Sequence, residues 1–126
     1  MMRFRAGAAA AAALSLVFSV AAVAQPASVA VAVWSFVFTP NPIHLAAGRP
    51  VTIVFQNRSG SSHDFTAVTF FGTSRITAGA APEGEVELRP YETKVITLVP
   101  RAGVYKAHCS HFLHKQLGMS DTIIVD

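Results

Sequence analysis

Twelve consecutive residues, His108 to Met119, hold a dense group of side chains that can bind metals. The segment reads HCSHFLHKQLGM and contains the only cysteine of the chain, three of its five histidines and a methionine. Cys109, His114 and Met119 follow one another at the spacing C-x4-H-x4-M. A thiolate, an imidazole and a thioether on one short loop form a soft donor set. Strands at both ends of the loop would hold these donors rigidly, so the segment favours a β framework.

The donor types indicate copper. An ion that alternates between Cu(I) and Cu(II) suits two imidazoles and one thiolate in a trigonal plane, with a weak axial thioether. His63, which lies 46 positions before Cys109, is the candidate for the second imidazole. It would have to lie on a neighbouring strand. The predicted ligands of one mononuclear copper site are therefore His63, Cys109, His114 and Met119.

The rest of the chain reads as short apolar strands separated by Pro, Gly and Asn, without a helical period. Seven or eight strands with this spacing predict an all-β fold, an antiparallel Greek-key β-sandwich. Residues 72–84, rich in Gly, Ala and Thr, show the weakest pattern. The expected strands cover residues 29–38, 43–45, 51–57, 63–71, 85–89, 93–99, 104–109 and 121–125.

The first 24 residues have the pattern of a secretory signal peptide. Arg3 and Arg5 precede an uncharged apolar run over residues 6–21, and Ala22-Val23-Ala24 supplies small residues at a cleavage position. We therefore expect a signal peptide at 1–24 and one exported domain at 25–126, located in the periplasm. An uncleaved membrane anchor is the alternative, because the apolar run is nearly long enough to span a bilayer.

Charge and cysteine content narrow the possible partners. Without residues 1–24 the chain has eight basic and seven acidic residues, a net charge of +1, and no cluster of Lys or Arg. We therefore expect no nucleic-acid partner and no stable membrane insertion after cleavage. The single cysteine rules out an internal disulfide. A buried apolar cysteine is the simpler interpretation of such a residue, but the histidine and methionine at fixed offsets favour a ligand.

Three segments resemble the cupredoxin family of blue, type 1 copper proteins. FTPNPIHLAAGRPVTIVFQN resembles its early strands, GSSHDF its first histidine ligand, and GVYKAHCSHFLHKQLGM its ligand loop. The resemblance covers the expected mature chain. It implies a plastocyanin-like or azurin-like single domain that carries one electron at a time between redox partner proteins. In this family the second histidine ligand reaches the surface through an apolar patch, which implies transient docking of a monomer near His114. Phe112, Leu113 and Leu117 are the candidates for that patch.

The resemblance also bears on the remaining polar residues. In relatives, the residue after the first histidine often bonds the residue after the cysteine, which implies an Asp64–Ser110 pair that supports the ligands. His108 should point to the opposite face of its strand. In multicopper oxidases the matching histidine serves a second, catalytic copper. Residues 64–70 contain no histidine and the chain has no HxH pair, so we expect no enzyme activity. His111 is either a loop residue near the surface or an auxiliary metal ligand.

Two other functions fit the same residues. The surplus of histidines beside the main site also suits a periplasmic protein that buffers or sequesters copper. A zinc site made from Cys109 and the histidines is chemically reasonable, although it leaves Met119 without a role. His44 lies in an expected strand and is interpreted as a surface or packed residue.

Overall fold

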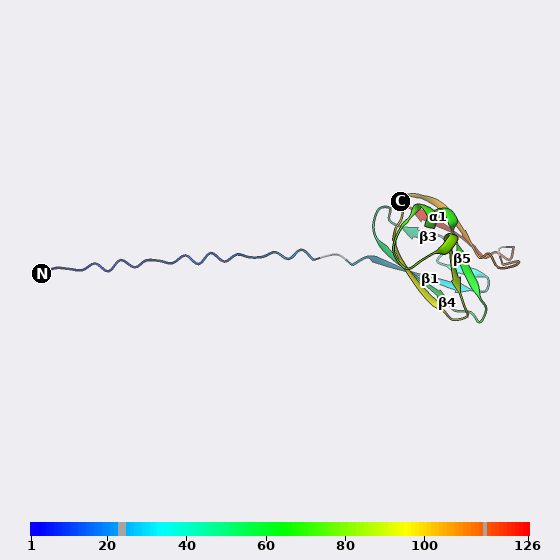
Figure 1. Cartoon of the computed structure of the whole chain (residues 1–126), viewed down its shortest axis with the longest axis horizontal. Helices are drawn as coiled ribbons and strands as arrows, with labels where there is room; N and C mark the ends of the chain where they lie inside the picture. The colour runs from blue at the N-terminus through cyan, green and yellow to red at the C-terminus, as the bar shows by residue number, and fades with distance from the viewer. Residues whose placement is uncertain (23–24, 115) are drawn as a thin grey trace.

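The structure is a computed structural model that describes residues 1–22, 25–114 and 116–126. Residues 1–22 form no helix or strand and run as an extended segment away from the folded domain (Figure 1). No helix among the described residues is long and apolar enough to cross a membrane. The regular structure begins with the first strand at Ala27.

Two five-stranded sheets enclose one hydrophobic core. The strand order is β2-β1-β4-β8-β6 in one sheet and β3-β10-β9-β5-β7 in the other. The strands of the first sheet are β1 (Ala27–Trp34), β2 (Val37–Thr39), β4 (Val51–Asn57), β6 (Arg75–Ala78) and β8 (Thr93–Val99). Those of the second are β3 (Ile43–Leu45), β5 (His63–Thr66), β7 (Glu85–Leu88), β9 (Gly103–His108) and β10 (Ser120–Val125).

This architecture confirms the predicted Greek-key β-sandwich, with two corrections. The strands number ten among the described residues, because the segment 29–38 is divided between β1 and β2 and the segment 72–84 contains β6. The sheets are also mixed and not purely antiparallel, since β1 pairs with β4 and β3 with β10 in parallel. Parallel partners come from distant parts of the chain, so the local apolar pattern did not indicate them.

Alternation of buried and partly exposed residues fixes the face that each strand turns to the core. In β4, Val51, Ile53 and Phe55 are buried, whereas the residues between them are half-buried. The ring of Phe65 on β5 lies 4.9 Å from that of Phe55 and 5.2 Å from that of Phe38, measured between centroids. Each such side chain contributes roughly 1.5–3 kcal/mol by burial. This aromatic contact therefore joins the two sheets.

One segment of the second sheet differs from the prediction. A strand was expected over residues 63–71, but β5 ends at Thr66 and the helix α1 (Val68–Thr73) follows. The helix buries Phe70 and Phe71, and the Phe70 ring lies 5.5 Å from that of Tyr105 on β9. The β-branched and aromatic residues of this segment favour a strand by propensity, and tertiary packing overrides that preference. A 3-10 helix, η1 (Pro82–Gly84), packs against α1.

The pairing of the second sheet gathers the ends of three strands at one end of the sandwich. β9 pairs with β10 so that His108 faces Ser120, and Thr66 of β5 faces His108 on the other side. The loop that joins β9 to β10 is orange in Figure 1 and projects from the end opposite the N-terminal segment. This end of the sandwich therefore carries the predicted ligand loop.

Candidate metal centre

Cys109 lies directly after β9, and its side chain is completely buried. Its backbone N–H donates to the carbonyl oxygen of Met119 at 3.0 Å, which joins the two ends of the loop. Met119 is also completely buried, and its own N–H donates to the carbonyl oxygen of His114 at 3.0 Å. The backbone N–H of Asp64 points at the Cys109 Sγ from 3.5 Å. The fold thus closes the segment 109–119 into one compact loop.

His63 is the first residue of β5 and brings a second imidazole to the thiol from the neighbouring strand. Its Nδ1 lies 3.2 Å from Nδ1 of His114. The Cys109 Sγ lies 4.0 Å from Nδ1 of His63 and 3.4 Å from Nδ1 of His114. The three donor atoms lie within 4.8 Å of one another, close enough for one ion to contact all of them.

Burial sets the electrostatics of this donor group. It raises the pKa of the Cys109 thiol, an effect that the backbone N–H of Asp64 partly offsets. Burial also lowers the pKa of His63, and the neighbouring imidazoles of His114 and His111 lower it further. Burial therefore favours the neutral imidazole of His63, the form that binds metals. A buried thiol and two imidazoles are a soft set that fits a copper ion.

The comparison with protein families decides the identity of the domain. The model of the cupredoxin-like domain matches residues 7–125, almost the whole chain. The chain belongs to the cupredoxin-like domain family. The resemblance stated from the sequence is therefore confirmed, and the family and the donor chemistry agree on copper as the cofactor of this cupredoxin.

Three solved structures with the same fold are auracyanins. Auracyanin A, described as a blue copper protein from the green thermophilic Chloroflexus aurantiacus, is 19% identical with a TM-score of 0.60, over 81% of this chain and all of its own. Dithionite-reduced auracyanin from Roseiflexus castenholzii is 16% identical with a TM-score of 0.61, over 82% of this chain and 99% of its own. Auracyanin B is 20% identical with a TM-score of 0.57, over 83% of this chain and 93% of its own. These similarities establish the fold. No curated protein matches the chain.

A hydrogen-bonded carboxylate connects the two ligand strands of the cupredoxin. Asp64, only 1% exposed, accepts the backbone N–H of Ser110 at 2.9 Å on Oδ1 and the Ser110 hydroxyl on Oδ2. The Thr66 hydroxyl donates to Oδ1 at 2.7 Å. The predicted Asp64–Ser110 pair is therefore confirmed. It fixes the residue after His63 to the residue after Cys109.

Sequence reasoning missed two residues at the turn between β1 and β2. The Ser35 hydroxyl lies 2.9 Å from Nε2 of His63, which directs Nδ1 of the same ring towards Cys109. The Phe36 ring meets His114 edge to face at 4.9 Å and His63 at 6.4 Å. Both residues lie inside the segment expected to be one continuous strand. A serine within an apolar run was the one local signal of the turn.

The other histidines occupy three different environments. His108, at the end of β9, is half-buried and is outside the donor group of Cys109. His44 on β3 is exposed. His111 lies at the rim of the centre, where its ring stacks on that of His114 with 5.5 Å between centroids and an interplanar angle of 18°. Its Nε2 lies 3.0 Å from Oε1 and 3.3 Å from Oε2 of Glu87. His111 therefore connects the ligand loop to β7.

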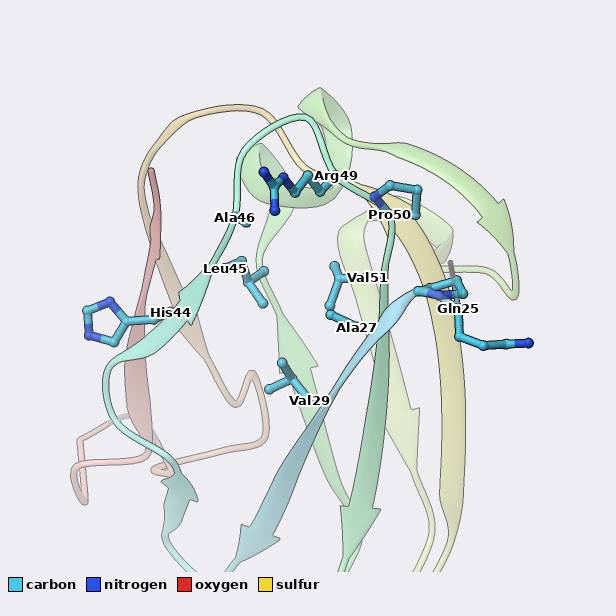
Figure 2. Close-up of a pocket in the computed structure, with 10 residues that line it drawn as sticks. Gln25, Ala27, Val29, His44, Leu45, Ala46, Arg49, Pro50 and Val51 are labelled. Atoms are coloured by element: carbon cyan, nitrogen blue, oxygen red, sulfur yellow. The ribbon is translucent and has the colours of Figure 1, made fainter. Parts of the chain in front are cut away.

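A hollow of about 510 Å³ lies where β1 and β4 begin, at the end of the sandwich remote from Cys109. Figure 2 shows Val29, Leu45 and Val51 around it, with Arg49 at its edge. The imidazole of His44 points away from these side chains in the same view. Neither of the two groups of metal-binding side chains found among the described residues lies in this hollow.

Proposed function

We propose that His63, Cys109, His114 and Met119 bind one copper ion in a type 1 site, and that the protein carries single electrons between redox partners. The observation that supports this most is the convergence, within 4.8 Å, of Sγ of Cys109 and Nδ1 of His114 on the loop after β9 with Nδ1 of His63 on β5. Bound copper supplies one-electron chemistry by alternating between Cu(I) and Cu(II). Ser35 orients His63, and the Asp64–Ser110 pair holds the two ligand strands together.

The surface around His114 has the character of a docking face for transient partners. Exposed apolar residues surround it on the ligand loop and on the β1–β2 turn. They include the three loop residues expected from the sequence, together with one residue of the turn and the first residue of β2. Such a patch suits brief encounters, because it is desolvated easily and makes few specific polar contacts. The set is Phe36, Val37, Phe112, Leu113 and Leu117.

Electron exchange tests the carrier function separately from copper binding. Phe112 is 87% exposed on the ligand loop, and Val104 is 69% exposed on β9. We expect Phe112→Ser to slow electron exchange between copper-loaded molecules while the visible spectrum stays the same. Val104→Ser, the matched control, should leave the exchange rate unchanged. Equal rates in all three proteins would remove Phe112 from the docking face. Exchange too slow to detect in the wild type would contradict the carrier function and favour copper buffering.

We further propose that residues 1–24 are a signal peptide and that residues 25–126 act in the periplasm. The extended path of residues 1–22, outside the sandwich, supports this division (Figure 1). Val23 and Ala24 of the expected cleavage position lie outside the described residues. N-terminal sequencing of the protein from the periplasmic fraction should read Gln25-Pro26 first. A mature protein that still begins at Met1 would support the membrane-anchor alternative.

We propose no enzymatic role. Among the described residues, the donor group of Cys109 contains only His63 and His114 as histidines. A catalytic copper would need further open coordination and its own ligands. Copper-loaded protein should therefore reduce neither oxygen nor nitrite in the presence of an electron donor.

A further inference from the structure

A second group of metal-binding side chains lies beside the copper ligands. Nε2 of His111, a carboxylate oxygen of Glu87 and a carboxylate oxygen of Asp64 all lie within 4.8 Å of one another. The imidazole comes from the ligand loop, Glu87 from β7 and Asp64 from β5. The side chains of His111 and Glu87 are 31% and 45% exposed, so the group is open to solvent on one side.

The spacing of these donors matches a tetrahedral ion. Zinc binds nitrogen and oxygen at about 2.0–2.2 Å, which places neighbouring donors about 3.4 Å apart. Nε2 of His111 lies 3.0 Å from Oε1 of Glu87 and 3.7 Å from Oδ2 of Asp64. Two of the three donor–donor distances are therefore within a few tenths of an ångström of that spacing, and the third is within 4.8 Å. Three protein donors would leave a fourth position for water.

Asp64 has one acceptor position left for such an ion. A carboxylate offers about four lone-pair sites. Thr66 and the Ser110 N–H occupy two on Oδ1, and the Ser110 hydroxyl occupies one on Oδ2. The remaining site is on Oδ2, the oxygen that faces His111. The Asp64 carboxylate, which is only 1% exposed, therefore has a lone pair on Oδ2 for an ion bound beside His111 and Glu87.

The side chains around the group of Asp64, Glu87 and His111 carry more negative than positive charge. A third acidic residue, Glu85, lies near Asp64 and Glu87. It shares the half-buried face of β7 with Glu87. Burial raises the pKa of Glu85, and the charge of Asp64 adds to the rise. Lys94 lies in the same depression, but its ammonium pairs with Glu92 at 3.7 Å. Within the described part of the chain, His111 is the one basic group paired with these carboxylates.

We propose that Asp64, Glu87 and His111 form a second metal site, which takes a borderline divalent cation such as Zn²⁺ or Cu²⁺. It goes beyond electron transfer by the type 1 centre and does not require that function. The two sites share structural elements, since Asp64 follows the ligand His63 and the His111 ring stacks on the ligand His114. A cation at the rim site places positive charge beside the copper. Its binding should therefore favour Cu(I) and raise the reduction potential.

Zinc is the probe of choice because it is colourless and has no redox chemistry. The protein is first loaded with one copper, so that Cys109 is occupied, and bound zinc is then counted by equilibrium dialysis with elemental analysis. We expect one zinc per copper-loaded chain in the wild type. Glu87→Gln and, independently, His111→Ala should each weaken zinc binding by more than about tenfold. Glu83→Gln removes a neighbouring exposed carboxylate outside the group and should bind zinc like the wild type.

The copper chromophore serves as an internal control. A normal visible band in Glu87→Gln shows that the variant is folded and that its type 1 centre is intact. Absence of saturable zinc binding by the copper-loaded wild type would overturn the rim site. Equal zinc affinity in the wild type, Glu87→Gln and His111→Ala would do the same. Failure of the wild type to take up copper with a visible band would instead contradict the proposed function, so the two failures are distinguishable.

Discussion

At the scale of single residues, the proposed centre includes side chains that orient the proposed ligands as well as those ligands themselves. His63 and Asp64 are adjacent, so their side chains point to opposite faces of β5. His63 reaches Cys109 and Ser35, whereas Asp64 reaches Ser110. One dipeptide thereby supplies a proposed ligand and the hydrogen bonds that hold the neighbouring loop.

Ser35 provides the first prediction. Ser35→Ala removes the partner of His63 Nε2, so the ring should lose its fixed orientation. We expect copper affinity to fall by about tenfold, the lower range for loss of a residue that supports a metal ligand. Competition with a chelator of known affinity measures the change. Ser28→Ala, at an exposed position of β1, the strand that precedes this turn, is the control. Equal affinities in Ser35→Ala and the wild type would remove Ser35 from the account.

Asp121 provides a pH-dependence prediction. It is 3% exposed, and its Oδ2 has no hydrogen-bond partner among the described residues. Burial raises its pKa from 3.8 to about 6. The folded protein keeps this proton to a higher pH than the unfolded chain does. As the pH rises from about 4 to about 6, the free energy of unfolding should therefore fall by about 1–3 kcal/mol in total.

Asp121→Asn cannot ionise and should lose that part of the pH dependence. Denaturant unfolding at a series of pH values compares the variant with the wild type. Glu92→Gln, near the surface in the turn before β8, is the control and should keep the wild-type profile. A profile for Asp121→Asn as steep as that of the wild type would show that Asp121 is not the responsible group.

At the scale of elements, the connection after β5 determines where the site strands lie. Gly84, the last residue of η1, has φ +77°, and a Cβ there would lie 2.6 Å from the Cα of Val68 in α1. The N–H of Ala67 donates to the Gly84 carbonyl at 2.9 Å. This close approach joins the end of β5 to the start of β7, the two strands that carry Asp64 and Glu87.

Gly84 and Gly48 form a matched pair for testing that approach. Both have positive φ, but a Cβ at Gly48 meets no atom within 4 Å. Gly48→Ala should cost only the backbone strain, about 1–2 kcal/mol, whereas Gly84→Ala should destabilise the fold by at least about 2 kcal/mol more. Thermal and denaturant unfolding measure both values. Equal losses in the two variants would show that contact with α1 is unimportant.

Most strand bounds and the ligand loop could be predicted because their signals are local. The alternation in Val51–Asn57 identifies β4 directly, and the spacing from Cys109 to Met119 identifies the loop. The helix at Val68–Thr73 could not be predicted, because its cause is the packing of Phe70 on Tyr105, which is 35 positions away. The contacts of Ser35 with His63 and of Glu87 with His111 are equally non-local.

At the scale of the whole molecule, the two ends of the sandwich have different roles. The ligand loop and the apolar residues around His114 lie at one end, and the extended N-terminal segment leaves from the other (Figure 1). A leader or anchor at residues 1–22 would therefore not cover the proposed docking face. The arrangement keeps the copper end accessible to partners whether or not the segment is cleaved.

We propose that Cys109 supplies the thiolate of a copper centre. The most direct measurement is the visible absorption spectrum of copper-loaded protein, with the copper content determined after excess ion is removed. We predict one retained copper per chain and an intense visible band. Cys109→Ser should lose the band, and His44→Ala, an exposed histidine on β3, should keep it. A copper-loaded wild type without visible colour, or a Cys109→Ser variant with an unchanged band, would contradict the account.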